Sequence, residues 1–396
     1  MIHKFSVSNF YSFKDFCEMD FTVNEHAPKT NSYIESAKNY RITKVGAIFG
    51  HNASGKTNLL RTLPFLKWFI TSSFNTKPEE EIPFKPFFFN KIEKKDTVFS
   101  VVFELQKKIY KYDLVLNTKK IISENLEEND KKLFSRKWDE TKSKYIYDFK
   151  KYGISKEFEN LIRDNASVIS VGAQAKHDLS INIYKYWENL STNIIESGKI
   201  STDNNILGAS ETYFKNPRLK EKAEKLLAQF DLGLSKIEIT EHKFDEGDNK
   251  KVYLPFAKHI YDDENNSFQM PFVYESHGTI NLFSLLPRIF DCLDKGSVIV
   301  LDEFDADLHP QMLPVLIELF TSKKHNPKNA QIIFNSHSPQ ILNELDKYQI
   351  YFTEKDKKCS SCVYRLSDIE GVRVDDNYYA KYISGKYGAV PDIDLE

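Results

Sequence analysis

The chain has 396 residues, enough for one large domain or two modest ones, and a formal net charge of −2. With 28% charged residues it is a globular composition that has no global basic footprint for nucleic acid. No apolar run approaches the ~18 residues of a membrane span, and the amino terminus lacks the apolar core of a signal peptide. Four cysteines in a chain of this size indicate a reducing compartment, so we expect a cytoplasmic protein without membrane contact.

The amino-terminal part has the pattern of an α/β domain that opens with β structure. Alternating residues predict paired strands over 6–15 and 17–21, and an apolar run predicts a buried strand over 44–49. A helix is expected from Thr57 to about Phe74, with a kink at Pro64, because proline breaks the helical hydrogen-bond ladder.

Between that strand and that helix lies a loop that fits G-x-x-x-x-G-K-[ST] without a gap, from Gly50 to Thr57. The two glycines let successive N–H groups converge on phosphates at a helix N-terminus. Lys56 is expected to reach the β- and γ-phosphates, and the Thr57 hydroxyl to hold Mg²⁺. The residues expected to bind ATP here are Gly50, Asn52, Ala53, Ser54, Gly55, Lys56, Thr57 and Asn58.

The middle of the chain changes from strands to helices. Strand-like alternation is found over 97–105, 109–116, 120–126 and 144–149, and helical spacing of apolar residues runs from about 155 to 233. Formal charge over 151–235 sums to about zero, so this segment offers no electrostatic groove for a phosphate backbone. We expect three parts, with boundaries at 1–150, 151–235 and 236–396.

The second half has two apolar strands that end in polar residues. Residues 297–303 end in Asp302 and Glu303, which suit Mg²⁺ coordination and polarisation of the attacking water, respectively. Residues 331–338 form another apolar strand, and His337 after it can contact the γ-phosphate, although a capping or surface histidine is an equal alternative. Ligands sit at the carboxyl ends of parallel strands, so these residues are expected at one edge of a sheet.

Upstream of these strands, residues 275–282 open a helix with Ser276, Gly278 and a further hydroxyl. Such an N-terminus can bind phosphate, although ordinary N-cap chemistry explains Ser276 equally well in isolation. One subunit seldom places two helix N-termini on the same γ-phosphate. A dimer in which this helix faces the partner's nucleotide loop is the expected solution.

Taken together, these motifs resemble the ABC-type ATPases of the SMC/RecF kind. Residues 50–57 resemble the Walker A motif of these proteins, including its asparagine, here Asn52. Residues 276–279 resemble a degenerate signature motif, and residues 298–303 resemble Walker B. Residues 305–310 resemble the D-loop, and His337 resembles the switch histidine. The resemblance implies an α/β fold, a P-loop ABC ATPase head with a mixed sheet and an antiparallel β arm, interrupted by a mainly helical insertion. It also implies ATP and Mg²⁺ as cofactors. ATP would be sandwiched between heads of a homodimer or higher homo-oligomer, with Ser276, Gly278 and Asp307 contributing to nucleotide binding and Glu303 and His337 to catalysis.

A narrower resemblance is to the RloA/AbiL-type ATPases, to which the ATPase of the PARIS system (AriA) is closely related. It is carried by Asn9–Phe13, by Asn52–Leu60 and by residues 382–391 near the end of the chain. It implies a bacterial anti-phage role in which the ATPase senses infection, with a phage-derived trigger as a candidate input. The output would be a separately encoded effector, a TOPRIM or RloB-like nuclease.

The chain departs from the wider family in two respects. No heptad array separates the halves, and no glutamine stands at the expected Q-loop position. Asn90 could replace that metal-side glutamine, although a buried strand end is the favoured interpretation. A lone C-x-x-C at 359–362 favours a hairpin tip over a zinc site, which needs four ligands.

Two other function classes stay open from the sequence. One is a RecF/OLD-like ATPase in DNA repair or DNA-end processing, and direct nucleic-acid binding is left undecided. An OLD protein carries a TOPRIM nuclease of roughly a hundred residues with a D-x-D motif after the ATPase. The 59 residues after His337 (396 − 337) are not expected to hold one. The other class is a non-hydrolysing scaffold that uses ATP only to clamp.

Overall fold

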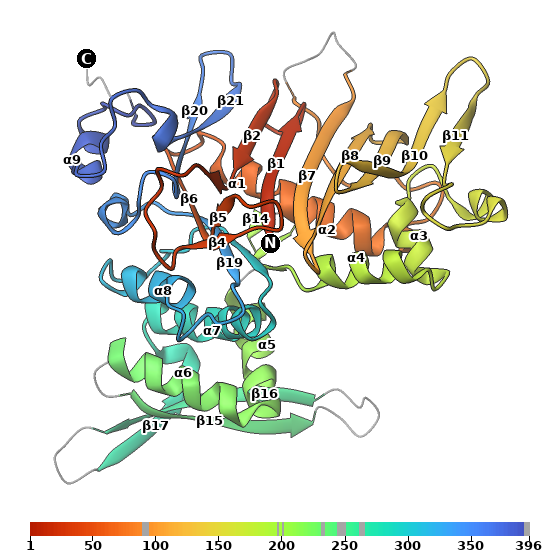
Figure 1. Ribbon diagram of the computed structural model, residues 1–396. Helices are drawn as coiled ribbons and strands as arrows, with labels where there is room; N and C mark the ends of the chain where they lie inside the picture. Colours follow the sequence, from red (N-terminus) through yellow and green to blue (C-terminus); the bar gives the residue numbers. More distant parts are fainter. Residues whose placement is uncertain are drawn as a thin grey trace.

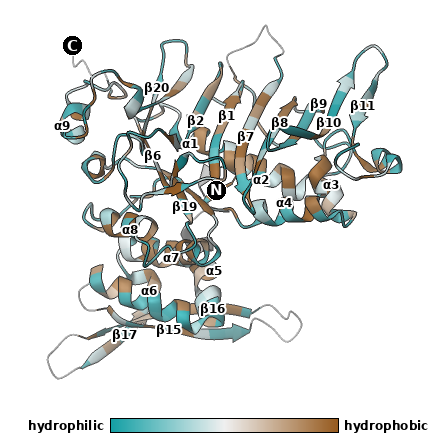
Figure 2. Ribbon diagram, in the orientation of Figure 1, coloured by the Kyte–Doolittle hydropathy of each residue, from teal (hydrophilic) through white to brown (hydrophobic). Residues whose placement is uncertain are grey.

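The computed structural model describes residues 1–88, 95–195, 198–199, 202–230, 234–243, 251–260 and 266–391, and the fold class is the predicted one, mixed α/β. Figure 1 shows a central sheet, a second sheet that extends to one side, and a smaller body of helices and strands below the central sheet. Hydrophobic residues mark three helices in Figure 2, α2 (Thr62–Ser72), α3 (Val168–Gln174) and α7 (His277–Lys295), which pack in the two large cores.

The central sheet has six strands in the order β12-β18-β19-β6-β20-β21. Their bounds are β6 Val45–Phe49, β12 Ser191–Thr192, β18 Val298–Leu301, β19 Gln331–Asn335, β20 Ile350–Lys355 and β21 Ser361–Arg365. Pairing is parallel from β12 to β20, and only β21 is antiparallel to its neighbour. Every residue of β6, β18 and β19 is buried, as expected of parallel strands covered on both faces. The predicted strands around 44–49, 297–303 and 331–338 are therefore confirmed, and their carboxyl ends lie at one edge.

The second sheet is antiparallel and has seven strands in the order β11-β10-β9-β8-β7-β1-β2. Their bounds are β1 Ile2–Ser8, β2 Cys17–Asp20, β7 Thr97–Leu105, β8 Lys108–Leu116, β9 Ile121–Glu128, β10 Lys131–Asp139 and β11 Lys144–Asp148. The predicted β arm is thus present, with β10 as an additional strand. β10 was missed because its sequence, KKLFSRKWD, is dominated by charged residues on the exposed face.

The helix after the nucleotide loop is divided into α1, Lys56–Leu60, and α2, Thr62–Ser72. Arg61 lies between them and belongs to neither. The interruption falls one turn before Pro64, because the proline ring clashes with the carbonyl four residues earlier, that of Leu60. The predicted kink corresponds to this one-residue interruption, across which Arg61 keeps a helical backbone conformation and hydrogen bonds to Thr57 and Phe65.

The helices expected between 155 and 233 are divided between two parts of the molecule. α3, Val168–Gln174, and α4, Asp178–Glu188, pack on α2 beside the antiparallel sheet. α5, Thr202–Lys215, and α6, Pro217–Phe230, pack instead on α7, His277–Lys295. Between these pairs the chain supplies β12 to the central sheet. The helices of segment 151–235 therefore pack on two parts of the molecule, because helical periodicity shows that a face is apolar but not which surface will cover it.

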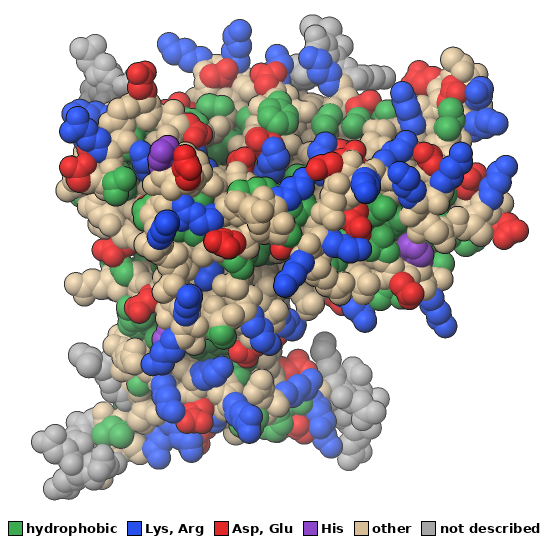
Figure 3. Space-filling model, viewed as in Figure 1, with side chains coloured by type: hydrophobic (Ala, Val, Ile, Leu, Met, Phe, Trp, Pro, Cys, Tyr) green, Lys and Arg blue, Asp and Glu red, His purple; other side chains and the backbone are tan. Residues whose placement is uncertain are grey.

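The lower body in Figure 1 combines α5 and α6 with a three-stranded antiparallel sheet of β15, Leu234–Lys243, β16, Lys251–Ile260, and β17, Ser267–Pro271. Lys and Arg side chains gather over this body in Figure 3, with acidic side chains among them. Several of these lysines form ion pairs, such as Lys225 with Glu221 and Lys251 with Glu241. The positive charge of this body is therefore partly neutralised by acidic residues of the same chain.

The remaining elements are short. They are the strands β3 Thr22–Val23, β4 Tyr33–Glu35, β5 Arg41–Thr43, β13 Ile194–Ile195 and β14 Gly198–Lys199, the helices α8 Met312–Thr321 and α9 Tyr378–Ile383, and the 3-10 turns Ser73–Asn75, Lys156–Leu161, Phe272–Tyr274, Pro339–Glu344 and Leu366–Asp368. Cys359 lies in the turn between β20 and β21, which confirms the predicted hairpin tip, and Cys362 lies in β21.

Among the described helices, none is both long and apolar enough to cross a membrane.

Candidate nucleotide site

The loop between β6 and α1 has the backbone geometry that its glycines predict. Gly50 and Gly55 have φ of +151° and +115°, in the region that favours glycine. A Cβ on Gly50 would lie 2.4 Å from the Thr353 carbonyl oxygen, and one on Gly55 would lie 2.5 Å from the Ser361 Oγ. Both glycines are thus required by conformation and by the close approach of β20 and β21.

Lys56 begins α1 and its side chain folds back inside this loop. Its Nζ donates hydrogen bonds to the carbonyl oxygens of Gly50, at 2.7 Å, and His51, at 3.1 Å. Burial lowers the pKa of the Lys56 ammonium, and the nearby carboxylates of Asp302, Asp305 and Glu303 oppose that shift. The ammonium therefore lies inside the curve of the loop and near the carboxylates that follow β18, where a phosphate chain would meet it.

Asp302 joins the ends of three central strands. Its Oδ1 accepts hydrogen bonds from the Thr57 hydroxyl, at 2.8 Å, and from the Asn335 amide, at 2.5 Å. Asp302 is only 4% exposed, which restricts the carboxylate to this arrangement. A hydroxyl and a carboxylate are oxygen donors of the kind that Mg²⁺ binds together with substrate phosphates. Thr57 and Asp302 thus fit the predicted metal, and the structure brings them together.

A residue that the sequence did not reveal, Asn193, holds Asp302 from the other side. Asn193 follows β12, the neighbour of β18, and is 8% exposed. Its amide nitrogen donates to the Asp302 carbonyl at 2.9 Å, and its amide oxygen accepts from the Asp302 N–H at 2.8 Å. Asn90, the predicted replacement for the metal-side glutamine, lies outside the described residues.

We expect Asn193→Ala to lower kcat for ATP hydrolysis about tenfold while changing KM for ATP less than threefold. Loss of the amide leaves the N–H and C=O groups of Asp302 without hydrogen-bond partners and allows the carboxylate to shift. An unsatisfied buried polar group costs about 1–3 kcal/mol of folding stability. Steady-state ATPase assays and thermal melting measure both effects. Asn189→Ala, the same change at the end of α4, is the matched control, and a kcat equal to that of this control would show that Asn193 does not position Asp302.

Glu303 and His337 lie on either side of Asn335, at the carboxyl ends of β18 and β19. The Glu303 N–H donates to the Asn335 amide oxygen, and its φ is +48°, in the left-handed region. Non-glycine residues held in this region concentrate at functional sites. Both side chains are exposed at this edge.

Asp305, a second residue that sequence reasoning did not single out for a role, fixes the loop that carries His337. It is 8% exposed and accepts hydrogen bonds from the His337 N–H, at 3.1 and 3.0 Å. The Ser338 hydroxyl donates to the same carboxylate at 2.8 Å. The backbone of the residues after β18 is thus tied to that of the residues after β19, so that Glu303 and His337 share one edge.

Ser276, Gly278 and Asp307 form a second group. The Ser276 hydroxyl accepts from the Thr279 N–H at 3.1 Å, so it does cap α7. A Cβ on Gly278 would lie 2.4 Å from the Asp307 carbonyl oxygen, which explains the glycine by close approach. The three residues line a hollow of about 540 Å³ that has no lining residue from the Gly50–Thr57 loop. The structure therefore assembles this group away from Lys56 of the same chain.

The remaining predicted loop residues divide into exposed and supported ones. Asn52 and Ala53 are exposed at the tip of the loop, whereas the buried Ser54 hydroxyl is 2.7 Å from that of Thr353. The Asn58 amide nitrogen donates to the Ser12 hydroxyl at 3.0 Å, and that hydroxyl in turn accepts from Ser361 at 2.8 Å. The Asn58 side chain thus anchors α1 to the amino-terminal Asn9–Phe13 segment.

Comparison with known proteins agrees with this geometry. A family model described as "AAA domain, putative AbiEii toxin, Type IV TA system" matches residues 46–343. No curated protein matches the chain. A solved structure described as the SmcHead bound to the C-winged helix domain of ScpA superposes with a TM-score of 0.50 at 12% identity, covering 92% of this chain and 97% of that one. At this identity the likeness concerns the fold alone, and it confirms the predicted fold of the head.

Proposed function

The chain belongs to the AAA-domain family described as putative AbiEii toxin, Type IV TA system, and we propose that it is the ATP-hydrolysing subunit of a bacterial anti-phage defence system. In this proposal ATP-dependent dimerisation controls a separately encoded effector. The observation that supports ATP hydrolysis best is the hydrogen bond from Thr57 to Asp302, because it joins the nucleotide loop to the acidic end of β18.

The proposed chemistry assigns one task to each side chain. Lys56 and the loop N–H groups bind the phosphates, and Thr57 and Asp302 would hold Mg²⁺, which supplies charge stabilisation of the transferred phosphoryl group. Glu303 orients the attacking water and accepts its proton, and its exposed position at the edge leaves it accessible to that water. His337 contacts the γ-phosphate, and Asp305 transmits the change when that phosphate leaves.

Dimerisation is proposed from the separation of the two groups of nucleotide-binding residues. Ser276 and Asp307 are exposed beside the hollow near α7, and the nucleotide loop does not line that hollow. Val273 and Tyr274, just before Ser276, are 59% and 74% exposed. Apolar and aromatic side chains next to a phosphate-binding helix N-terminus are suited to a protein partner. A second copy that presents its own nucleotide loop would complete both sites.

We expect a mixture of Lys56→Ala and Ser276→Arg subunits to recover about a quarter to a half of wild-type ATPase activity, although each variant alone is inactive. One composite site in the mixed dimer has an intact Lys56 and an intact Ser276. Activity is measured on heterodimers isolated with two different affinity tags. The absence of recovery in heterodimers of verified composition would argue against a shared site, and Ser322→Arg, at the end of α8, is the matched control for bulk and charge.

The defence role is supported by the family description and by the resemblance to the RloA/AbiL-type ATPases. It is tested in bacteria that carry this gene with its natural neighbours and are challenged with a panel of phages. Plaque formation should fall at least a hundredfold for a susceptible phage, and Lys56→Ala or deletion of the neighbouring effector gene should restore it. Sensitivity to DNA damage on deletion of the gene, without any loss of phage protection, would favour the RecF/OLD-like function instead.

A further inference from the structure

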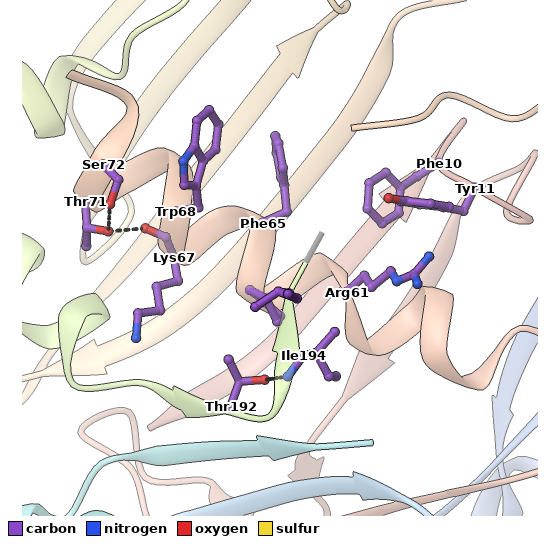
Figure 4. Close-up of a pocket in the computed structure, with 12 residues that line it drawn as sticks. Phe10, Tyr11, Arg61, Phe65, Lys67, Trp68, Thr71, Ser72, Thr192 and Ile194 are labelled. Carbon is purple, nitrogen blue, oxygen red and sulfur yellow. Dashed lines mark hydrogen bonds between the residues drawn. The ribbon is translucent and has the colours of Figure 1, made fainter. Parts of the chain in front are cut away.

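A pocket of about 470 Å³ lies along α2. Figure 4 shows its walls, which come from α2, from the Phe10–Tyr11 turn and from the residues that follow β12. Its volume falls within the range of pockets that bind small molecules, about 300–1,000 Å³. None of Lys56, Thr57, Asp302 and Glu303 lines it, so it is distinct from the candidate ATP site.

The floor of the pocket is aromatic and held in place by ring packing. Phe10 and Phe65 are 1% and 7% exposed, and their ring centroids are 6.2 Å apart. Trp68 packs 6.0 Å from Phe65, and Tyr11 lies edge-on 4.7 Å from Phe10. Ile195, which also lines the pocket, is 48% exposed. The pocket is therefore preformed and suited to an apolar, flat body.

The polar character of the pocket is cationic. The Arg61 guanidinium lies 4.8 Å from the centre of the Tyr11 ring, as Figure 4 shows, and donates to the Asn58 amide oxygen at 3.3 Å. Its Nε is buried without a hydrogen-bond partner in the described structure, and no carboxylate of the described residues pairs with it. Lys67 adds a second positive charge and donates to the Leu190 carbonyl. The lining contains no Asp or Glu, so these charges attract an anion.

We propose that this pocket binds a small organic anion that has an aromatic body, with Arg61 as the partner of the anionic group. The aromatic floor stacks against the flat body, and the guanidinium supplies charge and hydrogen-bond donors at its edge. A cationic ligand would be repelled by Arg61 and Lys67. A polar neutral ligand such as a sugar would leave its hydroxyls facing the apolar floor without partners.

The walls of the pocket also support the ATP site, so that occupancy and nucleotide binding are coupled. Arg61 contacts Asn58, which anchors α1. On the opposite wall Thr192 and Ile194 flank Asn193, whose amide holds the backbone of Asp302. A ligand that shifts either wall changes the position of a nucleotide-loop or acidic residue, and by linkage ATP changes the affinity for the ligand. Binding of the anion itself does not rest on the proposed function.

The first test uses 8-anilino-1-naphthalenesulfonate, a fluorescent aromatic anion, titrated into the full chain without nucleotide. We expect one saturable site that Ile195→Glu weakens about tenfold, whereas Ile195→Lys stays within threefold of wild type. Both variants remove the same exposed aliphatic side chain, so the difference between them reports the charge preference. Ile383→Glu, at a 55% exposed position on α9, controls for the substitution itself. Equal affinity of the Ile195→Glu and Ile195→Lys variants, or the absence of saturable binding, would overturn the proposal.

The second test repeats the titration with Mg²⁺ and ATP, after a labelled nucleotide has established that ATP binds. We expect ATP to change the dissociation constant of the probe at least threefold in wild type and not at all in Lys56→Ala. An unchanged constant in wild type that binds ATP would overturn the coupling. Competitive displacement of the probe by ATP in Lys56→Ala would show instead that the pocket is part of a nucleotide site and would overturn its assignment to a separate ligand.

Discussion

Replacing Lys56 with alanine should weaken ATP binding by up to about a hundredfold and abolish hydrolysis. The Lys56 Nζ lies inside the nucleotide loop, bonded to the Gly50 and His51 carbonyls. The ammonium would donate charge-assisted hydrogen bonds to the phosphates of ATP. Each such bond contributes about 1.5–3 kcal/mol to the binding free energy. Fluorescence anisotropy with a labelled ATP analogue and Mg²⁺ measures the affinity. Phage protection should disappear in parallel.

Two further variants separate this effect from a loss of folding. Burial lowers the pKa of Lys56, so the charged form is disfavoured in the folded chain relative to the unfolded one. The ammonium therefore costs stability at neutral pH, and this cost is absent above the ordinary lysine pKa. Lys56→Met, which keeps the aliphatic stem, should melt no lower than wild type while failing to bind ATP. Lys77→Ala, at an exposed lysine, should bind ATP normally. Wild-type affinity in Lys56→Ala would place the phosphates elsewhere.

The nucleotide loop could be predicted from sequence because its determinants are local. Gly50, Gly55, Lys56 and Thr57 act within eight residues, and their backbone conformation follows from residue type. The buried strands β6, β18 and β19 could be predicted for a related reason, since a parallel strand covered on both faces is a continuous apolar run. The carboxyl ends of such strands meet at one edge, and for this reason the sequence predicts Asp302, Glu303 and His337 there.

Asn193 and Asp305 could not be found in the same way, because their roles depend on partners that are distant in the sequence. Asn193 is held to Asp302 across 109 residues and directly follows a two-residue strand, which is too short to leave a periodic pattern. Asp305 is one of several acidic residues after β18, and only its bonds to His337 and Ser338 distinguish it. A useful signal for Asn193 would have been its place after a strand that pairs with β18, which requires the sheet order. The same limit applies to the helices of 155–233, whose apolar faces are covered by two different cores.

Glu303→Gln should retain ATP binding and slow hydrolysis about 10²–10⁴-fold, the contribution typical of a positioned general base. The amide is nearly isosteric with the carboxylate but cannot accept a proton from the attacking water. The Glu303 N–H is held by Asn335, so the backbone should keep its left-handed conformation in the variant. ATP should then persist between two heads. Light scattering after size-exclusion chromatography should show a doubled mass with ATP and Mg²⁺, and a single mass without nucleotide.

Glu344→Gln makes the same chemical change at an exposed glutamate in the turn after β19 and serves as the matched control. It should hydrolyse ATP at the wild-type rate and show no persistent dimer. Turnover of Glu303→Gln within twofold of this control would assign the base to another residue, with Asp305 and His337 as the neighbouring candidates on the same edge. Slow hydrolysis without a change in mass would support Glu303 as the general base but would contradict the proposed ATP-bound dimer. The hydrolysis rate therefore tests the role of the Glu303 carboxylate, and the mass tests whether ATP holds two heads together.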